Sequence, residues 1–105
     1  MADLPHFSDV EGFEWDRANI QKNWQRHHVA FYECEEVFFH EPLVVAPNPT
    51  HSVAEARYFA YGRTVRGRLL TVVFTVRGKK FRMISARDMS WRERKVYESK
   101  AQADS

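Results

Sequence analysis

The chain has 105 residues, a formal net charge of +2 and 44% apolar residues. This length suffices for one domain, and the apolar content can supply a core, which excludes a largely disordered chain. The longest mainly apolar run, residues 69–76, is far too short for a membrane span. The single cysteine, Cys34, forms no internal disulfide, and no signal sequence is visible at the N-terminus, so we expect a cytoplasmic protein with no membrane contact.

Charge is divided unevenly along the chain. Residues 1–56 carry three basic and ten acidic side chains (net −7), whereas residues 57–105 carry thirteen basic and four acidic ones (net +9). The split indicates either two faces with different partners, the basic one suited to a polyanion such as RNA or to an acidic protein, or simply two solvated surfaces that balance each other.

The N-terminal part predicts an arm, a strand and a helix. Residues 1–12 have mixed charge and no clear periodicity, so we expect a loosely held arm. Residues 13–15 alternate in polarity, which is typical of a short strand. Asp16 is a good N-cap for a helix over residues 17–27.

One face of that first helix is expected to be apolar. Ile20, Trp24, His27 and Phe31 follow at spacings of four, three and four residues. The pattern therefore predicts that Trp24 belongs to the core.

A second, acidic helix is expected over residues 31–38. It should end before Pro42, because proline disfavours a helical conformation in the residue before it. A short strand at residues 43–46 and a proline-containing loop at residues 47–52 follow.

Three further strands are expected at residues 56–64, 69–76 and 80–85. Short turns separate them, so they form a three-stranded antiparallel meander. The last helix should cover residues 91–100, because Ser90 and Glu93 form a capping box.

Arginines gather where the last strand meets this helix. Arg82, Arg87, Arg92 and Arg94 lie on one strand-to-helix connection, and such a cluster beside a helix N-terminus suits an anion. Arg82 and Arg87 are five residues apart, so a regular strand would direct them to opposite faces of the sheet. They converge only if the strand ends or bulges near Ser85.

Several short motifs follow one another in the order seen in one protein family. The sequence resembles the BrnT toxins of type II toxin–antitoxin systems over residues 13–98. The motifs are Phe13-x-Trp15-Asp16, Asn23-x-x-Arg26-His27-x-Val29-x-Phe31, Glu55-x-Arg57, Gly62-Arg63, Arg82-x-Ile84-Ser85-Ala86-Arg87 and Glu93-Arg94-x-x-Tyr97.

The resemblance implies an α+β fold of the RelE-like type. Two N-terminal helices would pack against a small antiparallel sheet, with a helix at the C-terminus, in one domain over residues 13–100 followed by a frayed tail, 101–105. It also implies an endoribonuclease that inhibits translation and growth. Its partner would be a BrnA-like ribbon-helix-helix antitoxin, which would neutralise the toxin and make the only contact with operator DNA.

The chain departs from the family pattern at two helix ends. The family has Lys-His-Gly where this chain has Arg26-His27-His28, and Asp-Pro where it has Glu41-Pro42. A glycine at position 28 would serve as a left-handed helix cap, a conformation that histidine adopts less readily.

RNA cleavage without a metal needs a base, an acid and cations that stabilise the phosphorane. We expect Arg82 and Arg87, with Arg57 as a third candidate, to bind the phosphate. The alternative is that these arginines form surface salt bridges with the acidic second helix. The resemblance adds Arg63, Arg94 and Tyr97 as expected substrate-binding residues, although a tyrosine at the last position is also commonly a packing residue.

His27 is the candidate acid or base, because histidine titrates near neutral pH. The alternative is a packed core histidine bonded to Asp16 or to a carbonyl. Cys34 lies among acidic residues, which raise the pKa of a thiol, so it is a poor nucleophile. We expect no metal and no cofactor, since the usual zinc and phosphate-loop motifs are missing from the sequence. The other function considered is a non-catalytic interaction module whose basic sheet surface binds an acidic partner.

Overall fold

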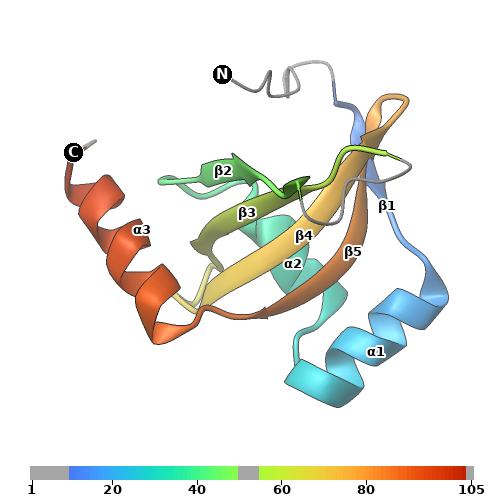
Figure 1. Cartoon of the computed structure of the whole chain (residues 1–105). Helices are drawn as coiled ribbons and strands as arrows, with labels where there is room; N and C mark the ends of the chain where they lie inside the picture. The colour runs from blue at the N-terminus through green and yellow to red at the C-terminus, as the bar shows by residue number, and fades with distance from the viewer. Residues whose placement is uncertain (1–9, 50–54, 104–105) are drawn as a thin grey trace.

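The computed structural model describes residues 10–49 and 55–103, and the fold is a five-stranded sheet with three helices (Figure 1). The predicted α+β class is thus confirmed. Most of the predicted arm, part of the predicted loop and the end of the tail lie outside the described residues, so the division at residues 12 and 100 stays a prediction. The elements, in chain order, are β1 (Gly12–Glu14), α1 (Arg17–His27), α2 (Phe31–Val37), β2 (Val44–Pro47), β3 (Tyr58–Arg63), β4 (Leu69–Arg77), β5 (Lys80–Asp88) and α3 (Trp91–Ala103).

The sheet is larger than the predicted meander. Strands β3, β4 and β5 form the expected antiparallel meander, and the two short predicted strands extend it to the order β1-β5-β4-β3-β2. Strand β2 pairs antiparallel with β3, but β1 pairs parallel with β5. The predicted meander and both short strands are therefore confirmed, and the expectation of an entirely antiparallel sheet was wrong for one pairing, because local patterns predict a strand without showing which edge it joins.

The core lies between α2 and one face of the sheet. Leu70, Val72 and Phe74 of β4 are fully buried there, and Val37 of α2 packs beside them. Gly62 of β3 permits this close approach, since a Cβ at that position would lie 2.7 Å from Cγ1 of Val37. No helix of the described residues is long and apolar enough to cross a membrane.

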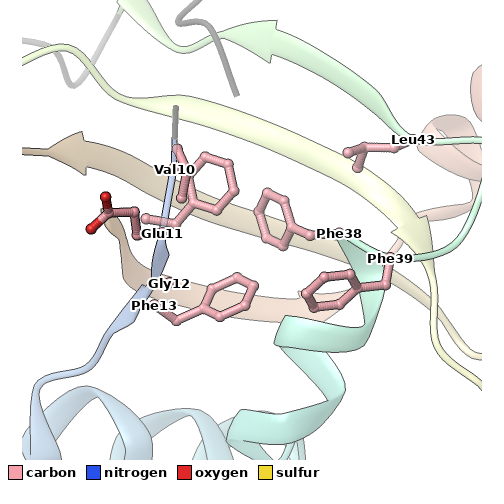
Figure 2. Close-up of a pocket in the computed structure, with 8 residues that line it drawn as sticks. Val10, Glu11, Gly12, Phe13, Phe38, Phe39 and Leu43 are labelled. Carbon is pink, nitrogen blue, oxygen red and sulfur yellow. The ribbon is translucent and has the colours of Figure 1, made fainter. Parts of the chain in front are cut away.

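An aromatic cluster joins β1 to the end of α2. The ring of Phe38 stacks on Phe81 at a centroid distance of 4.6 Å, and Phe13 lies 5.6 Å from Phe38 and 5.9 Å from Phe39. Figure 2 shows the rings of Phe13, Phe38 and Phe39 beside Val10 and Leu43. Burial of Phe13 against this cluster accounts for the attachment of so short a strand as β1.

Helix α1 lies along β5 and turns an asparagine toward it. Asn23 is buried, and its Oδ1 accepts a hydrogen bond from the backbone N–H of Ala86 at 3.3 Å. Trp24 is instead 54% exposed, so its predicted place in the core was wrong. Strand β1 pairs with β5 only as far as Arg82, and the open edge beyond it needs a polar partner. The side chain of Asn23 is that partner. Because Asn23 faces β5, the residue after it, Trp24, faces outward.

The end of α1 adopts the left-handed cap that the family pattern suggested. His28 has φ 53° and ψ 38°, and its N–H donates to the carbonyl of Trp24 at 2.9 Å. The ring of His28 meets that of Trp24 edge to face at 5.5 Å. The chain therefore keeps the cap conformation without glycine, at the steric cost of a Cβ in this region.

Arg68 ties this corner together. Its guanidinium donates to the carbonyls of His27 at 3.1 Å and His28 at 2.9 Å, and it pairs with Asp88 at 2.7 Å and Glu33 at 3.3 Å. One side chain thus links α1, α2 and β5 and satisfies carbonyls that the helix leaves unpaired.

The left-handed cap predicts opposite effects for two substitutions at position 28. His28→Gly is expected to be at least as stable as the wild type, because glycine relieves the strain. His28→Val is expected to lower the free energy of unfolding by about 1–2 kcal/mol, because a β-branched residue strongly disfavours this backbone conformation. Urea unfolding measures both changes, with Gln25→Val on the exposed surface of α1 as the control. Equal destabilisation by both substitutions would contradict the strain at this cap.

Candidate functional site

A bulge in β5 brings the two principal arginines to the same face of the sheet. Val73 of β4 pairs with Ser85 and Phe74 pairs with Met83, so Ile84 is an extra residue in β5. Arg82 consequently faces Thr75, and Arg87 faces Thr71. Since these threonines alternate with the core residues of β4, both arginines lie on the face away from α2.

Two more predicted arginines share this face. Arg57, Phe59, Tyr61 and Arg63 follow one another at intervals of two residues, so their side chains share one face. Tyr61 and Phe59 pair directly with Thr71 and Val73 of β4. The carbonyl of Arg57 accepts from Asn48 N–H at 2.9 Å, which continues the pairing of β2 with β3 beyond the strand. We call this surface the arginine face; it comprises Arg57, Phe59, Tyr61, Arg63, Thr71, Thr75, Arg82 and Arg87.

Arg87 is held by a carboxylate at the start of α3. Its guanidinium binds Glu93 through two hydrogen bonds of 2.6 and 2.9 Å. Glu93 also accepts from Thr71 at 3.1 Å and from the N–H of Ser90 at 2.8 Å, which completes the predicted capping box. The bond from Arg87 is the main reason that the pKa of Glu93 falls to about 2. The pair therefore stays ionised, with Arg87 fixed at the junction of sheet and helix.

Arg82 is paired at the other end of the face. Its guanidinium lies 3.5 Å from Glu14 of β1 and 3.9 Å from Asp16, and its side chain is 22% exposed. The alternative that these arginines pair with the acidic second helix was wrong in its partners, because α2 covers the opposite face. Among the described residues, Arg68 pairs with α2 through Glu33, a contact that no local pattern of the sequence predicted.

Two aromatic residues of the arginine face escaped the sequence analysis. Phe59 and Tyr61 stack with a centroid distance of 5.8 Å and an interplanar angle of 28°. Burial, and then the charge of Glu93, raise the pKa of the Tyr61 hydroxyl, whereas Arg87 lowers it. Tyr61 therefore lies within electrostatic reach of the Arg87–Glu93 pair. The signal available was the i, i+2 spacing of two aromatic residues in a strand whose next position is Arg63.

His27 lies apart from this face. It is exposed at the end of α1, so the alternative of a packed core histidine was wrong. A hydrogen bond from Arg68 is the main cause of the lowered pKa of Asp88, and His27 and Arg94 lower it further. These two predicted residues therefore lie near Asp88. Asp88 pairs with the core residue Leu70, so its side chain lies on the face of the sheet opposite to that of Arg87.

Tyr97 packs rather than facing the surface. It is buried, and its hydroxyl donates to the carbonyl of Pro42 at 2.6 Å. Burial raises the pKa of this hydroxyl, and Arg63 opposes the shift. The contact anchors α3 to the segment before β2, as the packing alternative expected.

Cys34 and the cavity beside β1 are less suited to RNA chemistry than the arginine face. The pKa of the Cys34 thiol is raised to about 12, first by burial and then by Glu33 and Glu35, which confirms a poor nucleophile. Within residues 10–49 and 55–103, no three His, Cys, Asp or Glu side chains gather as metal ligands would. The cavity in Figure 2, of about 300 Å³, is lined by apolar residues and by Glu11, so it presents no cation to a phosphate.

The lowered pKa of Glu93 predicts a loss of stability in acid. Its folded-state value, about 2, lies below the ordinary 4.5, so its contribution is complete above about pH 4.5 and disappears as the pH falls toward 2. Glu93→Gln is expected to be less stable than the wild type at neutral pH, with a difference that shrinks through this window. Urea midpoints across the pH range measure it, and Glu98→Gln on the same helix is the matched control. A constant difference at every pH would contradict the expectation.

Comparison with known proteins agrees with the resemblance seen in the sequence. A family model described as the ribonuclease toxin BrnT of type II toxin–antitoxin systems matches residues 15–93. The crystal structure of the Brucella abortus ribonuclease toxin BrnT is similar, with a TM-score of 0.60 and 24% identity, covering 77% of this chain and 99% of that one. No curated protein sequence matches significantly. The structural likeness shows a shared fold, and because the family model spans well over half of the chain, this protein belongs to the BrnT family of type II ribonuclease toxins.

Proposed function

We propose that this toxin is a metal-independent endoribonuclease that cleaves RNA on its arginine face and thereby inhibits translation and growth. The observation that carries the proposal is the bulge at Ile84, because it sets Arg82 and Arg87 on one surface. The stacked rings of Phe59 and Tyr61 lie on the same surface. A protein surface that binds single-stranded RNA combines cations, which contact the phosphate backbone, with aromatic rings, on which the bases stack.

The chemistry assigned to this face is transfer of the phosphoryl group to the neighbouring 2′-oxygen. A base removes the 2′-hydroxyl proton, the oxygen attacks phosphorus, and the bond to the 5′-oxygen breaks as an acid protonates that oxygen. Arg87 and Arg82 would stabilise the charge that gathers on the phosphorane, with Arg57 as a third cation. The two hydrogen bonds that Arg87 donates to Glu93 keep Arg87 charged and oriented before RNA arrives.

The proton transfer is assigned to His27, which is exposed near Asp88. RNA held by Arg87 would have to pass round the end of β5 to reach it, because Asp88 directly follows Arg87 and consecutive strand residues point to opposite faces of the sheet. Arg63 and Arg94 would hold the flanking backbone. Tyr97, whose hydroxyl is engaged by Pro42, would act by holding α3 in place.

The antitoxin of this type II system is proposed to be a BrnA-like ribbon-helix-helix protein in the cytoplasm. It would neutralise the toxin by covering it, and it alone would contact operator DNA. Covering the arginine face would suffice, because the antitoxin would then exclude the RNA backbone.

The arginine face is tested by removing its two principal cations. Arg82→Ala with Arg87→Ala is expected to slow RNA cleavage at least about a hundredfold and to abolish growth arrest, since the phosphorane loses its cations. Induction at matched soluble expression, with RNA integrity as the readout, measures this. The control is Arg66→Ala with Lys79→Ala, which removes the same charge from two turns. Arrest with RNA loss in both double variants would move the chemistry elsewhere, and no RNA cleavage by the folded wild type would favour the non-catalytic module.

The proton-transfer step is tested with purified protein. Cleavage is expected to continue undiminished in excess EDTA, because no metal takes part. His27→Ala is expected to slow it by roughly 10²–10⁴-fold. His40→Ala is the matched control, at a histidine outside the proposed site. Loss of activity in EDTA that Mg²⁺ restores would contradict the metal-independent mechanism, and full activity of His27→Ala would remove His27 from it.

A further inference from the structure

A cleft opens where α3 meets the edge of the arginine face. It has a volume of about 320 Å³, within the range of small-molecule sites. Val44 and Ala46 of β2 pair with Tyr61 and Phe59 of β3, so this side of the cleft continues the arginine face. We call it the α3 cleft; its lining residues are Val44, Ala46, Tyr61, Arg92, Glu93, Val96, Tyr97 and Lys100.

Apolar side chains line the α3 cleft from both β2 and α3. Val44 and Ala46 form one side, and Val96 of α3 forms the other. Val96 is 55% exposed, which is unfavourable for an aliphatic side chain unless something covers it. The ring of Tyr61, already stacked on Phe59, also lines the cleft. A planar ring inserted here would continue that aromatic stack and cover Val96.

The rim of the α3 cleft is basic. Arg92 and Lys100 lie two turns apart on α3 and both line the opening. The carboxylate of Glu93 is occupied by Arg87, Thr71 and the N–H of Ser90, so it presents little free negative charge to a ligand. An apolar slot with cations at its mouth complements a ring attached to a phosphate backbone.

We propose that the α3 cleft binds one nucleobase of single-stranded RNA, next to the phosphate held by Arg87. This inference rests on the proposed function, and it adds that the base bound in the cleft determines where the RNA is cut. Tyr61 connects the two parts, because it lines the cleft and lies within electrostatic reach of the Arg87–Glu93 pair. A base in a duplex is stacked on its neighbours and cannot enter, so the cleft restricts cleavage to unpaired segments.

The test fills the cleft without touching the arginines. Val96→Trp places a large ring in the slot, and Ser99→Trp places the same ring elsewhere on the exposed surface of α3 as the control. Circular dichroism and thermal unfolding establish that both variants are folded. Two readouts follow: the affinity for a short RNA whose 2′-hydroxyls are all methylated, so that it cannot be cleaved, and the map of cut positions on a long transcript.

Val96→Trp is expected to bind the uncleavable strand about tenfold more weakly and to lose the wild-type preference among cut positions, whereas Ser99→Trp is expected to keep both. Lys100→Glu, which changes only an exposed rim charge, is expected to weaken binding in the same direction. It provides a second variant if Val96→Trp does not fold.

Two outcomes would overturn the proposal. One is unchanged RNA affinity and an unchanged cut map in folded Val96→Trp. The other is loss of antitoxin binding by Val96→Trp while its RNA affinity stays at the wild-type value, which would make the α3 cleft a protein-docking site. Because affinity is measured on an uncleavable strand, an error about the cleft is distinguishable from a failure of the wild type to cleave RNA.

Discussion

One extra residue in β5 governs both faces of the sheet. Ile84 shifts the alternation of the strand, so Met83 and Ala86, three residues apart, both reach the core. The same shift sets Arg82 and Arg87 on the opposite face. In a regular strand, Met83 and Ala86 would point to opposite faces, and the core would lose one of them. Arg82 and Arg87 would likewise point to opposite faces, and the arginine face would lose a cation. The bulge therefore couples the stability of the sheet to the layout of the proposed site.

Ion pairs within the fold neutralise part of the charge asymmetry between the two halves of the sequence. Acidic residues of the N-terminal half supply Glu14 and Asp16 to Arg82 and Glu33 to Arg68. These pairs favour the simpler interpretation of the acidic half, in which it balances the basic half, over one that needs a separate partner. They also restrict the orientation of the two guanidinium groups. A phosphate that binds Arg82 competes with carboxylates 3.5 Å or more away, a weaker hold than the two short bonds between Glu93 and Arg87.

Local signals in the sequence predicted most elements and one condition on the site. The Asp16 cap and the Ser90–Glu93 capping box marked two helix starts, and alternation marked the strands. The requirement for a bulge near Ser85 followed from spacing alone, but its presence did not, because a bulge depends on how β4 pairs. Trp24 was misplaced for a related reason: helical periodicity shows an apolar stripe, whereas the open edge of β5 determined which residue of α1 faces inward. The stack of Phe59 and Tyr61 could be recognised only from the pairing of β3 with β4, which shows that both rings lie on the arginine face.

The end of α1 shows how a departure from the family pattern is absorbed. Histidine replaces the glycine of the left-handed cap, yet the cap forms, and Arg68 binds the carbonyls of both His27 and His28. Arg68 is itself fixed by Asp88, the residue after Arg87. The backbone of His27 is thus connected through Arg68 to the strand that carries Arg87. The strain at His28 therefore lowers the stability of the fold, while the position of His27 relative to the end of β5 is maintained by Arg68 and is independent of a glycine at the cap.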